Sequence, residues 1–131
     1  MKVQRIVANV EGSDFDKARD FYQGIFGLDL LMDLGWINTF GSKEVMPVQI
    51  SVASEGGSGT PVPDLSFEVT DLETALERAK NSNIKIEYGP VSELWKVKRF
   101  FIRDPFGKLI NVLKKHKGSS RTPSSAMNLA G

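Results

Sequence analysis

The chain contains no cysteine and only one histidine, His116, among its 131 residues. Disulfide bonds and thiolate metal sites are therefore excluded, and a two-histidine, one-carboxylate iron site cannot be assembled. There is also no apolar run of the length of a signal peptide or a membrane span, so a cytoplasmic protein without membrane contact is expected. The formal net charge is only +1, which predicts no general attraction to nucleic acid.

A length of 131 residues fits one domain. Within it, the same order of elements is expected twice, which we interpret as an internal duplication. A helix follows Asp14 in the first half, and a second helix follows Asp71 in the other half, each with an aspartate as its cap. Alternation of apolar and polar residues predicts strands at residues 3–10, 28–33, 36–41, 46–53, 64–69, 84–88, 95–103 and 108–114. The chain thus divides into two β-α-β-β-β modules, 3–53 and 64–114.

Residues 54–63 (SEGGSGTPVP) separate the modules and have the composition of a flexible linker. Residues 115–131 are basic, lack any apolar period and are expected to form a mobile tail. The expected organisation is one domain over residues 1–114, followed by that tail.

Three stretches of the sequence resemble the vicinal oxygen chelate superfamily, which includes glyoxalase I, bleomycin-resistance proteins, fosfomycin-resistance enzymes and extradiol dioxygenases. They read RIVANVEGSDFDKARDFYQGIFGLDL, DLSFEVTDLETALERA and FFIRDPFGKLINVL. The resemblance covers about residues 3–114. It implies an α+β fold in which both modules form a curved, open barrel of mixed β-sheet, with the helices outside and a pocket on the concave face.

The strands alternate between an apolar face and a polar face, and the apolar one is expected to pack under the helices. Its members are Ile6, Ala8, Val10, Val48, Ile50, Val52, Leu65, Phe67, Val69, Phe100, Ile102, Ile110 and Val112. The opposite face is the predicted ligand-binding face or, alternatively, an ordinary solvated one. Its candidate ligand-binding residues are Arg5, Asn9, Gln49, Asp64, Glu68, Trp95, Arg99, Phe101 and Asn111.

The resemblance also indicates where metal-using relatives place their ligands. Carried over one by one, these positions fall on Arg5, Gln49 (within one step of register), Asp64 and Asn111. A catalytic divalent ion needs about three protein ligands, and here only Asp64 is an anionic donor. We therefore expect no metal and no cofactor, and an Arg5–Asp64 salt bridge in place of the ion.

The predicted function is metal-independent binding of a small molecule, of the bleomycin-resistance type, without catalysis. Arg99 would suit a carboxylate or phosphate of the ligand, and Trp95 would stack on a flat apolar body. One alternative is an enzyme that uses Asp64 or Glu68 as acid or base, and another is a module that only pairs with a partner. A homodimer is expected, because open half-barrels leave strand edges uncovered.

Overall fold

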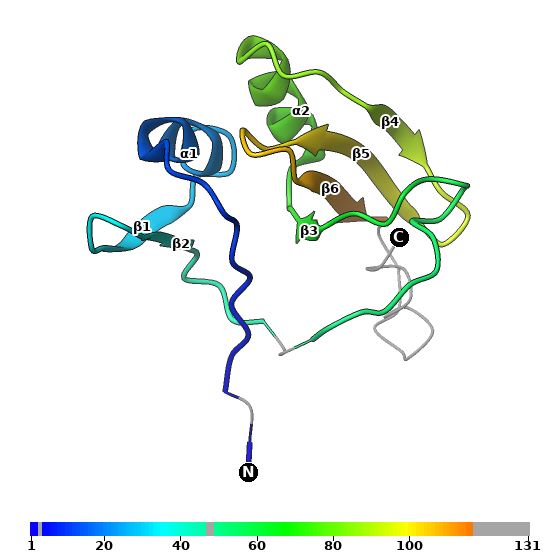
Figure 1. Cartoon of the computed structure of the whole chain (residues 1–131). Coiled ribbons are helices and arrows are strands. Elements are labelled where there is room, and N and C mark those ends of the chain that lie inside the picture. The colour runs from blue at the N-terminus through cyan, green and yellow to red at the C-terminus, as the bar shows by residue number, and fades with distance from the viewer. Residues whose placement is uncertain (3, 47–48, 117–131) are drawn as a thin grey trace. The chain divides into compact units, whose positions relative to one another are not determined.

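The computed structural model describes residues 1–2, 4–46 and 49–116. The elements follow in the order α1, β1, β2, β3, α2, β4, β5, β6 (Figure 1). The chain divides into two compact units, Met1–Ile50 and Ser51–Gly131. The α+β class and the mixture of parallel and antiparallel pairing agree with the sequence-based expectation. Neither of the two described sheets closes on itself.

The first unit consists of a short helix and a β-hairpin. Helix α1 (Phe15–Tyr22) begins where the Asp14 carboxylate accepts the Lys17 amide at 3.1 Å. Strands β1 (Asp29–Asp33) and β2 (Asn38–Gly41) pair antiparallel. The helix is joined to the hairpin by an aromatic stack, in which the rings of Tyr22 and Phe40 have centroids 5.7 Å apart.

Two strands expected in the first unit are not formed in the described residues. Residues 4–10 and the described part of 46–53 have no strand pairing, and Ile6, Ile50 and Val52 are exposed instead of packed under a helix. Val3 and Val48 lie outside the described residues. The expectation was wrong here for a physical reason. Alternation makes a segment suitable for a sheet, but an isolated strand has no partner for its backbone groups and is not stable on its own.

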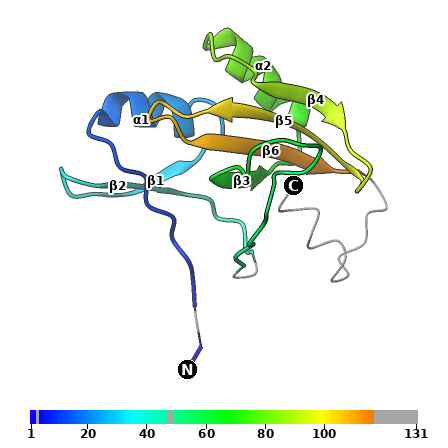
Figure 2. The same cartoon turned by 45° about the vertical axis from the view of Figure 1, so that its right-hand side comes forward.

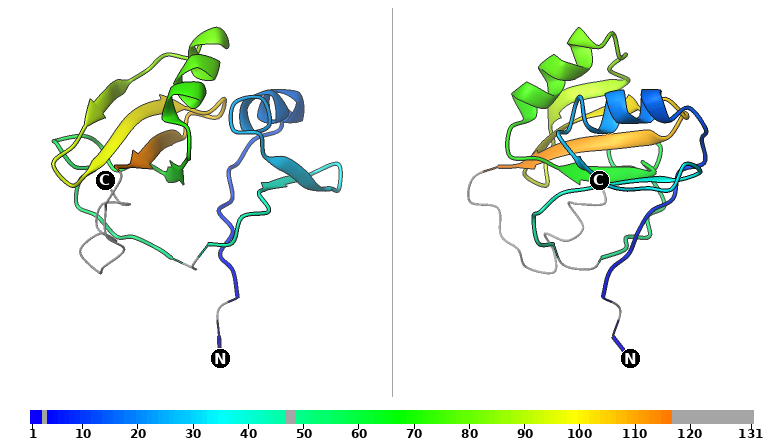
Figure 3. Two further views of the ribbon diagram at one scale, coloured as in Figure 1. Left: turned by 180° about the vertical axis from the view of Figure 1, so that it is seen from behind. Right: turned by 90° about the vertical axis from the view of Figure 1, so that its left-hand side faces the viewer.

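The second unit is a four-stranded sheet with one helix. The strands are β3 (Leu65–Glu68), β4 (Tyr88–Ser92), β5 (Val97–Arg103) and β6 (Leu109–Lys115), in the order β3-β6-β5-β4. β3 runs parallel to β6, and the other pairs are antiparallel. Helix α2 (Leu72–Asn81), capped by Asp71, covers one face of this sheet (Figure 3).

The register assigns each side chain of β5 and β6 to one of the two faces. Phe100 and Ile102 pair with Val112 and Ile110, and all four are completely buried. Lys98 shares their parity and contacts Glu73 of α2 at 3.2 Å, so this is the helix face. The opposite face carries Arg99, Phe101, Leu113 and Asn111. We call it the loop face, because residues 54–63 lie on that side of the sheet (Figure 2).

The alternation of β5 and β6 was therefore predicted correctly, and so was the turn between them. Asp104 closes this turn by accepting the amides of Phe106 and Lys108, each at 2.8 Å. The strand expected at 84–88 is found at Tyr88–Ser92 instead. Its ladder with β5 starts where Tyr88 pairs with Phe101, and the register shifts between Tyr88 and Val91. No helix in the described part of the chain is long and apolar enough to cross a membrane.

Candidate functional site

The loop face contains a buried ion pair between Arg99 of β5 and Glu93 of the β4–β5 turn. The two side chains are 0% and 6% exposed, and their closest charged atoms lie 2.7 Å apart. The guanidinium also lies near the rings of Tyr88, Trp95 and Phe101, at 5.3, 5.0 and 4.8 Å from their centroids. Desolvation strengthens both kinds of attraction, so the ion pair and the rings hold Arg99 in one position.

Residues 54–63, expected to be a flexible linker, include an ordered loop over residues 55–60. The Gly56 amide donates to the Thr60 carbonyl at 2.8 Å, which closes the loop on itself. Arg99 fastens it to the sheet by donating to the carbonyl oxygens of Gly56 at 2.8 Å and Gly57 at 3.2 Å. Gly57 has a φ of +86°, and a Cβ there would lie 2.7 Å from the Trp95 ring. A glycine-rich composition here serves close packing as well as flexibility.

Of the predicted site residues, Trp95, Arg99 and Phe101 are brought together. Arg99 does not line a solvated cavity, because it is completely buried and donates to Glu93, Gly56 and Gly57; its contact with a ligand stays a prediction. The reason is tertiary. The parity of β5 was predicted correctly, but which segment covers that parity depends on a loop 43 residues away in sequence.

Asn111 also lies on the loop face, in the central strand β6, and Asp64 directly precedes the edge strand β3. Asn111 is completely buried; its Nδ2 donates to Ser66 Oγ at 3.2 Å, and its Oδ1 has no partner. The Asp64 carboxylate accepts the Leu109 amide at 2.7 Å and thereby helps to join β3 to β6. Glu68 is exposed at the other end of β3. An unpaired buried acceptor such as Asn111 Oδ1 calls for a water or ligand donor.

Arg5, Asn9 and Gln49 are exposed residues of the first unit. The predicted Arg5–Asp64 salt bridge and the convergence of these three residues with the loop face join different units, and they stay predictions.

A cleft of about 420 Å³ opens on the loop face, within the second unit. Its apolar lining consists of Pro61, Leu109 and the rings of Tyr88 and Phe101, which lie 5.2 Å apart at 52°, with Phe101 only 1% exposed. Arg103 adds a cation and is held by Glu87 at 3.0 Å and by the Gly107 carbonyl at 2.9 Å. The complete lining is Ser58, Gly59, Thr60, Pro61, Glu87, Tyr88, Phe101, Arg103 and Leu109.

Sequence reasoning selected only Phe101 from this lining. Arg103 could have been found, because it has the parity of Arg99 and Phe101 and comes directly before the Asp104 turn. The loop residues Ser58–Pro61 could not have been found from the sequence, because nothing in this segment indicates the strand against which it packs.

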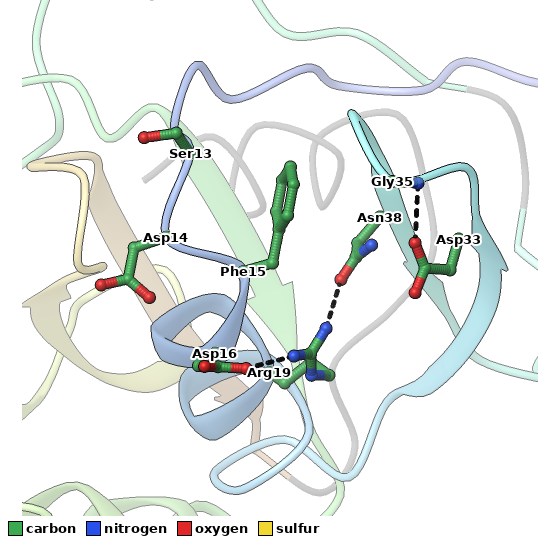
Figure 4. A pocket seen from close by; sticks show the side chains of 8 residues that line it. All are labelled: Ser13, Asp14, Phe15, Asp16, Arg19, Asp33, Gly35 and Asn38. Atoms are coloured by element: carbon green, nitrogen blue, oxygen red, sulfur yellow. Dashed lines mark hydrogen bonds and ion pairs between the residues drawn. The ribbon is translucent and has the colours of Figure 1, made fainter.

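A second cleft, of about 600 Å³, lies in the first unit between α1 and the hairpin (Figure 4). Its charged groups are used locally. Arg19 pairs with Asp16 and donates to Asn38 Oδ1 at 2.9 Å, and Asp33 accepts the Gly35 amide at 2.9 Å. The polar groups of this cleft therefore stabilise the start of α1 and the turn of the hairpin.

The model of the Glyoxalase/Bleomycin resistance protein/Dioxygenase superfamily matches residues 3–112. The chain belongs to this superfamily. No curated protein matches the sequence.

Three solved structures share the fold at low identity. TnmS3, an antibiotic binding protein from Streptomyces sp. CB03234, has a TM-score of 0.60 and 21% identity, over 88% of this chain and 96% of that one. TioX from Micromonospora sp. ML1 has a TM-score of 0.58 and 17% identity, over 89% and 100%. A superfamily member from Sphaerobacter thermophilus DSM 20745 has a TM-score of 0.61 and 19% identity, over 87% and 98%.

The residues at the superfamily's metal positions do not fit a divalent ion. Asp64 accepts a backbone amide, and the Asn111 amide nitrogen is bonded to Ser66. In the described ranges, no three histidine, cysteine, aspartate or glutamate side chains are grouped to hold a metal. Among the four expected positions only Asp64 is a carboxylate, whereas a catalytic divalent ion needs about three protein ligands.

Proposed function

We propose that this superfamily member binds a small molecule on the loop face without a metal ion and holds it without changing it. The ligand has a flat apolar body and an anionic group. One observation carries the proposal: the cleft combines the rings of Tyr88 and Phe101 with the guanidinium of Arg103. A concave site of mainly apolar walls with a few polar groups is the usual form of a ligand pocket.

Two further observations support binding over catalysis. TnmS3, which shares the fold, is described as an antibiotic binding protein. The carboxylate of Asp64, the residue considered for acid–base chemistry, accepts the amide of Leu109 within the sheet. Sequestration of an antibiotic or metabolite therefore fits better than a reaction that uses Asp64 or Glu68.

The proposal includes a homodimer in which the modules roll into open half-barrels. The first unit exposes apolar side chains, with Trp36 at 74% and Ile50 at 82% exposure, and a second copy would cover them. The predicted residues Arg5, Asn9 and Gln49 would then complete the ligand site from the first unit.

Native mass spectrometry of the purified protein, followed by identification of bound small molecules, tests the function directly. Calorimetry with a series of planar aromatic carboxylates then tests the chemistry. Arg103→Gln is expected to weaken binding by about tenfold, because a charge-assisted contact is lost. Arg78→Gln is the control, since it removes the same charge from α2. Equal affinity of both variants would exclude Arg103 as the anion partner.

Elemental analysis of protein prepared without chelators tests metal independence. We expect no stoichiometric zinc, nickel, manganese or iron, and no change of ligand affinity with EDTA. A stoichiometric transition metal that disappears in Asp64→Ala would overturn this part of the proposal.

A further inference from the structure

The loop formed by residues 55–60 is one wall of the cleft. Ser58, Gly59 and Thr60 of the loop line the cleft together with Tyr88 and Phe101 of the sheet. A ligand in the cleft contacts the loop, so the position of the loop bears on how the ligand enters and leaves.

Two sets of hydrogen bonds hold this wall, and they differ in burial. The Arg99 bond to the Gly56 carbonyl is buried, whereas Ser58 Oγ donates to Glu93 Oε1 at 3.0 Å in an exposed bond. The exposed bond is at the tip of the loop, where Ser58 has a φ of 53°, an uncommon value for a residue other than glycine. It is the contact that water can replace most easily.

Glu93 connects the loop to Tyr88 of β4. One carboxylate oxygen accepts Ser58 Oγ, and the other accepts the Tyr88 hydroxyl at 2.9 Å and Arg99 Nε at 2.7 Å. A ligand that contacts and displaces the Tyr88 ring therefore also perturbs the Glu93 carboxylate, which holds the loop. Networks of this kind respond as a unit, because each member polarises and orients the others.

We propose that the Ser58–Glu93 hydrogen bond is the latch of the cleft, and that Glu93 is a positioning residue that couples the loop to Tyr88. This inference rests on the proposed function. Breaking the latch lets Ser58 and Gly59 move from the cleft, while Arg99 stays in its buried pair and keeps the Gly56 and Gly57 carbonyls on the sheet. The latch therefore governs the rate at which a ligand dissociates more than the stability of the fold.

Stopped-flow fluorescence with anilinonaphthalene sulfonate, a flat aromatic anion, tests the latch. We define the signal of the cleft as the part of the fluorescence change that is lost in Arg103→Gln. Ser58→Ala is expected to raise the dissociation rate constant of this signal by about three- to tenfold, as loss of one exposed hydrogen bond would. The melting temperature of Ser58→Ala should equal that of the control Ser92→Ala, in which an exposed serine of β4 is replaced.

Ser58→Gly separates the hydrogen bond from the backbone conformation, since glycine adopts a positive φ readily. It should accelerate dissociation as much as Ser58→Ala does. Dissociation at the wild-type rate in both variants would overturn the latch.

Amide hydrogen exchange of Gly56 and Thr60 gives a readout that needs no ligand. Both amides are bonded within the loop and should exchange faster in Ser58→Ala than in Ser92→Ala. Unchanged exchange would also overturn the latch. A wild-type protein that gives no signal dependent on Arg103 contradicts the proposed function instead, so the two failures are distinguishable.

Discussion

Arg99 and Glu93 form an ion pair, 2.7 Å between charged atoms, from which solvent is almost completely excluded. They lie six residues apart, on β5 and on the turn that precedes it. The pair is the point at which the sheet, the aromatic side chains and the 55–60 loop meet, and each of the first two predictions below alters one component of it.

Arg99→Ala is expected to lower the free energy of unfolding by about 3–5 kcal/mol, because it leaves the buried Glu93 carboxylate without its cationic partner. Lys98→Ala is the control on the neighbouring position. It removes the exposed bridge to Glu73 and should cost less than about 1 kcal/mol. Urea denaturation measures both values. A loss of less than about 1 kcal/mol for Arg99→Ala would mean that Glu93 regains water or another partner.

Gly57→Ala is expected to destabilise the protein by about 1–2 kcal/mol more than Gly59→Ala. Both glycines have a positive φ, so the backbone cost of alanine is similar in the two variants. They differ in space: a Cβ on Gly57 would lie 2.7 Å from the Trp95 ring, whereas a Cβ on Gly59 has no neighbour within 4 Å. Equal melting temperatures of the two variants would contradict the packing of the loop against Trp95.

Asp71 is the helix cap whose titration should affect stability at acid pH. The Thr74 hydroxyl, at 2.6 Å, is the main cause that lowers the pKa of the Asp71 carboxyl below its ordinary value; the Thr74 amide, at 3.0 Å, adds to it. Because the folded pKa is the lower one, this stabilisation is present above the unfolded pKa and is lost as the pH falls through the folded value.

Thr74→Val keeps the amide but removes the hydroxyl, so the pKa of Asp71 should rise. The difference in unfolding free energy between neutral and acid pH should become smaller than in the wild type. Titration of the carboxyl carbon by NMR gives the pKa, and Thr70→Val serves as the control. A pKa of Asp71 that does not move in Thr74→Val would refute the assignment.

The protein is expected to be a homodimer, with a mass by light scattering of twice the 14.5 kDa of one chain. A standard interface buries about 800 Å² on each partner. The exposed apolar side chains of the first unit would be buried in it. Ile50→Asp should shift the equilibrium toward the monomer. Leu94→Asp, at an exposed apolar position of the second unit, should not. A wild-type protein that is monomeric at high concentration would count decisively against the dimer.

Local chemistry in the sequence was sufficient for the helices, the last hairpin and the parity of β5 and β6. Asp14 and Asp71 cap the helices where expected, and Phe100 and Val112 face the helix as their spacing predicts. These features depend on contacts between near neighbours, on the alternation of side chains along a strand, and on the turn chemistry of Asp104. The family could also be predicted, because its motifs lie in these same segments.

Only the tertiary structure decided which side chains on one face of the sheet contact each other and which segment of the chain covers them. Arg99 was expected to line a solvated cavity, but it is buried and holds the carbonyl oxygens of Gly56 and Gly57. The alternating residues around Ile6 and Ile50 were expected to form strands, yet they have no pairing in the described part of the chain. Alternation specifies the side to which a residue points, but a strand or a cavity also requires a second segment. That partner is supplied by residues distant in sequence, so the periodicity of one segment cannot identify it.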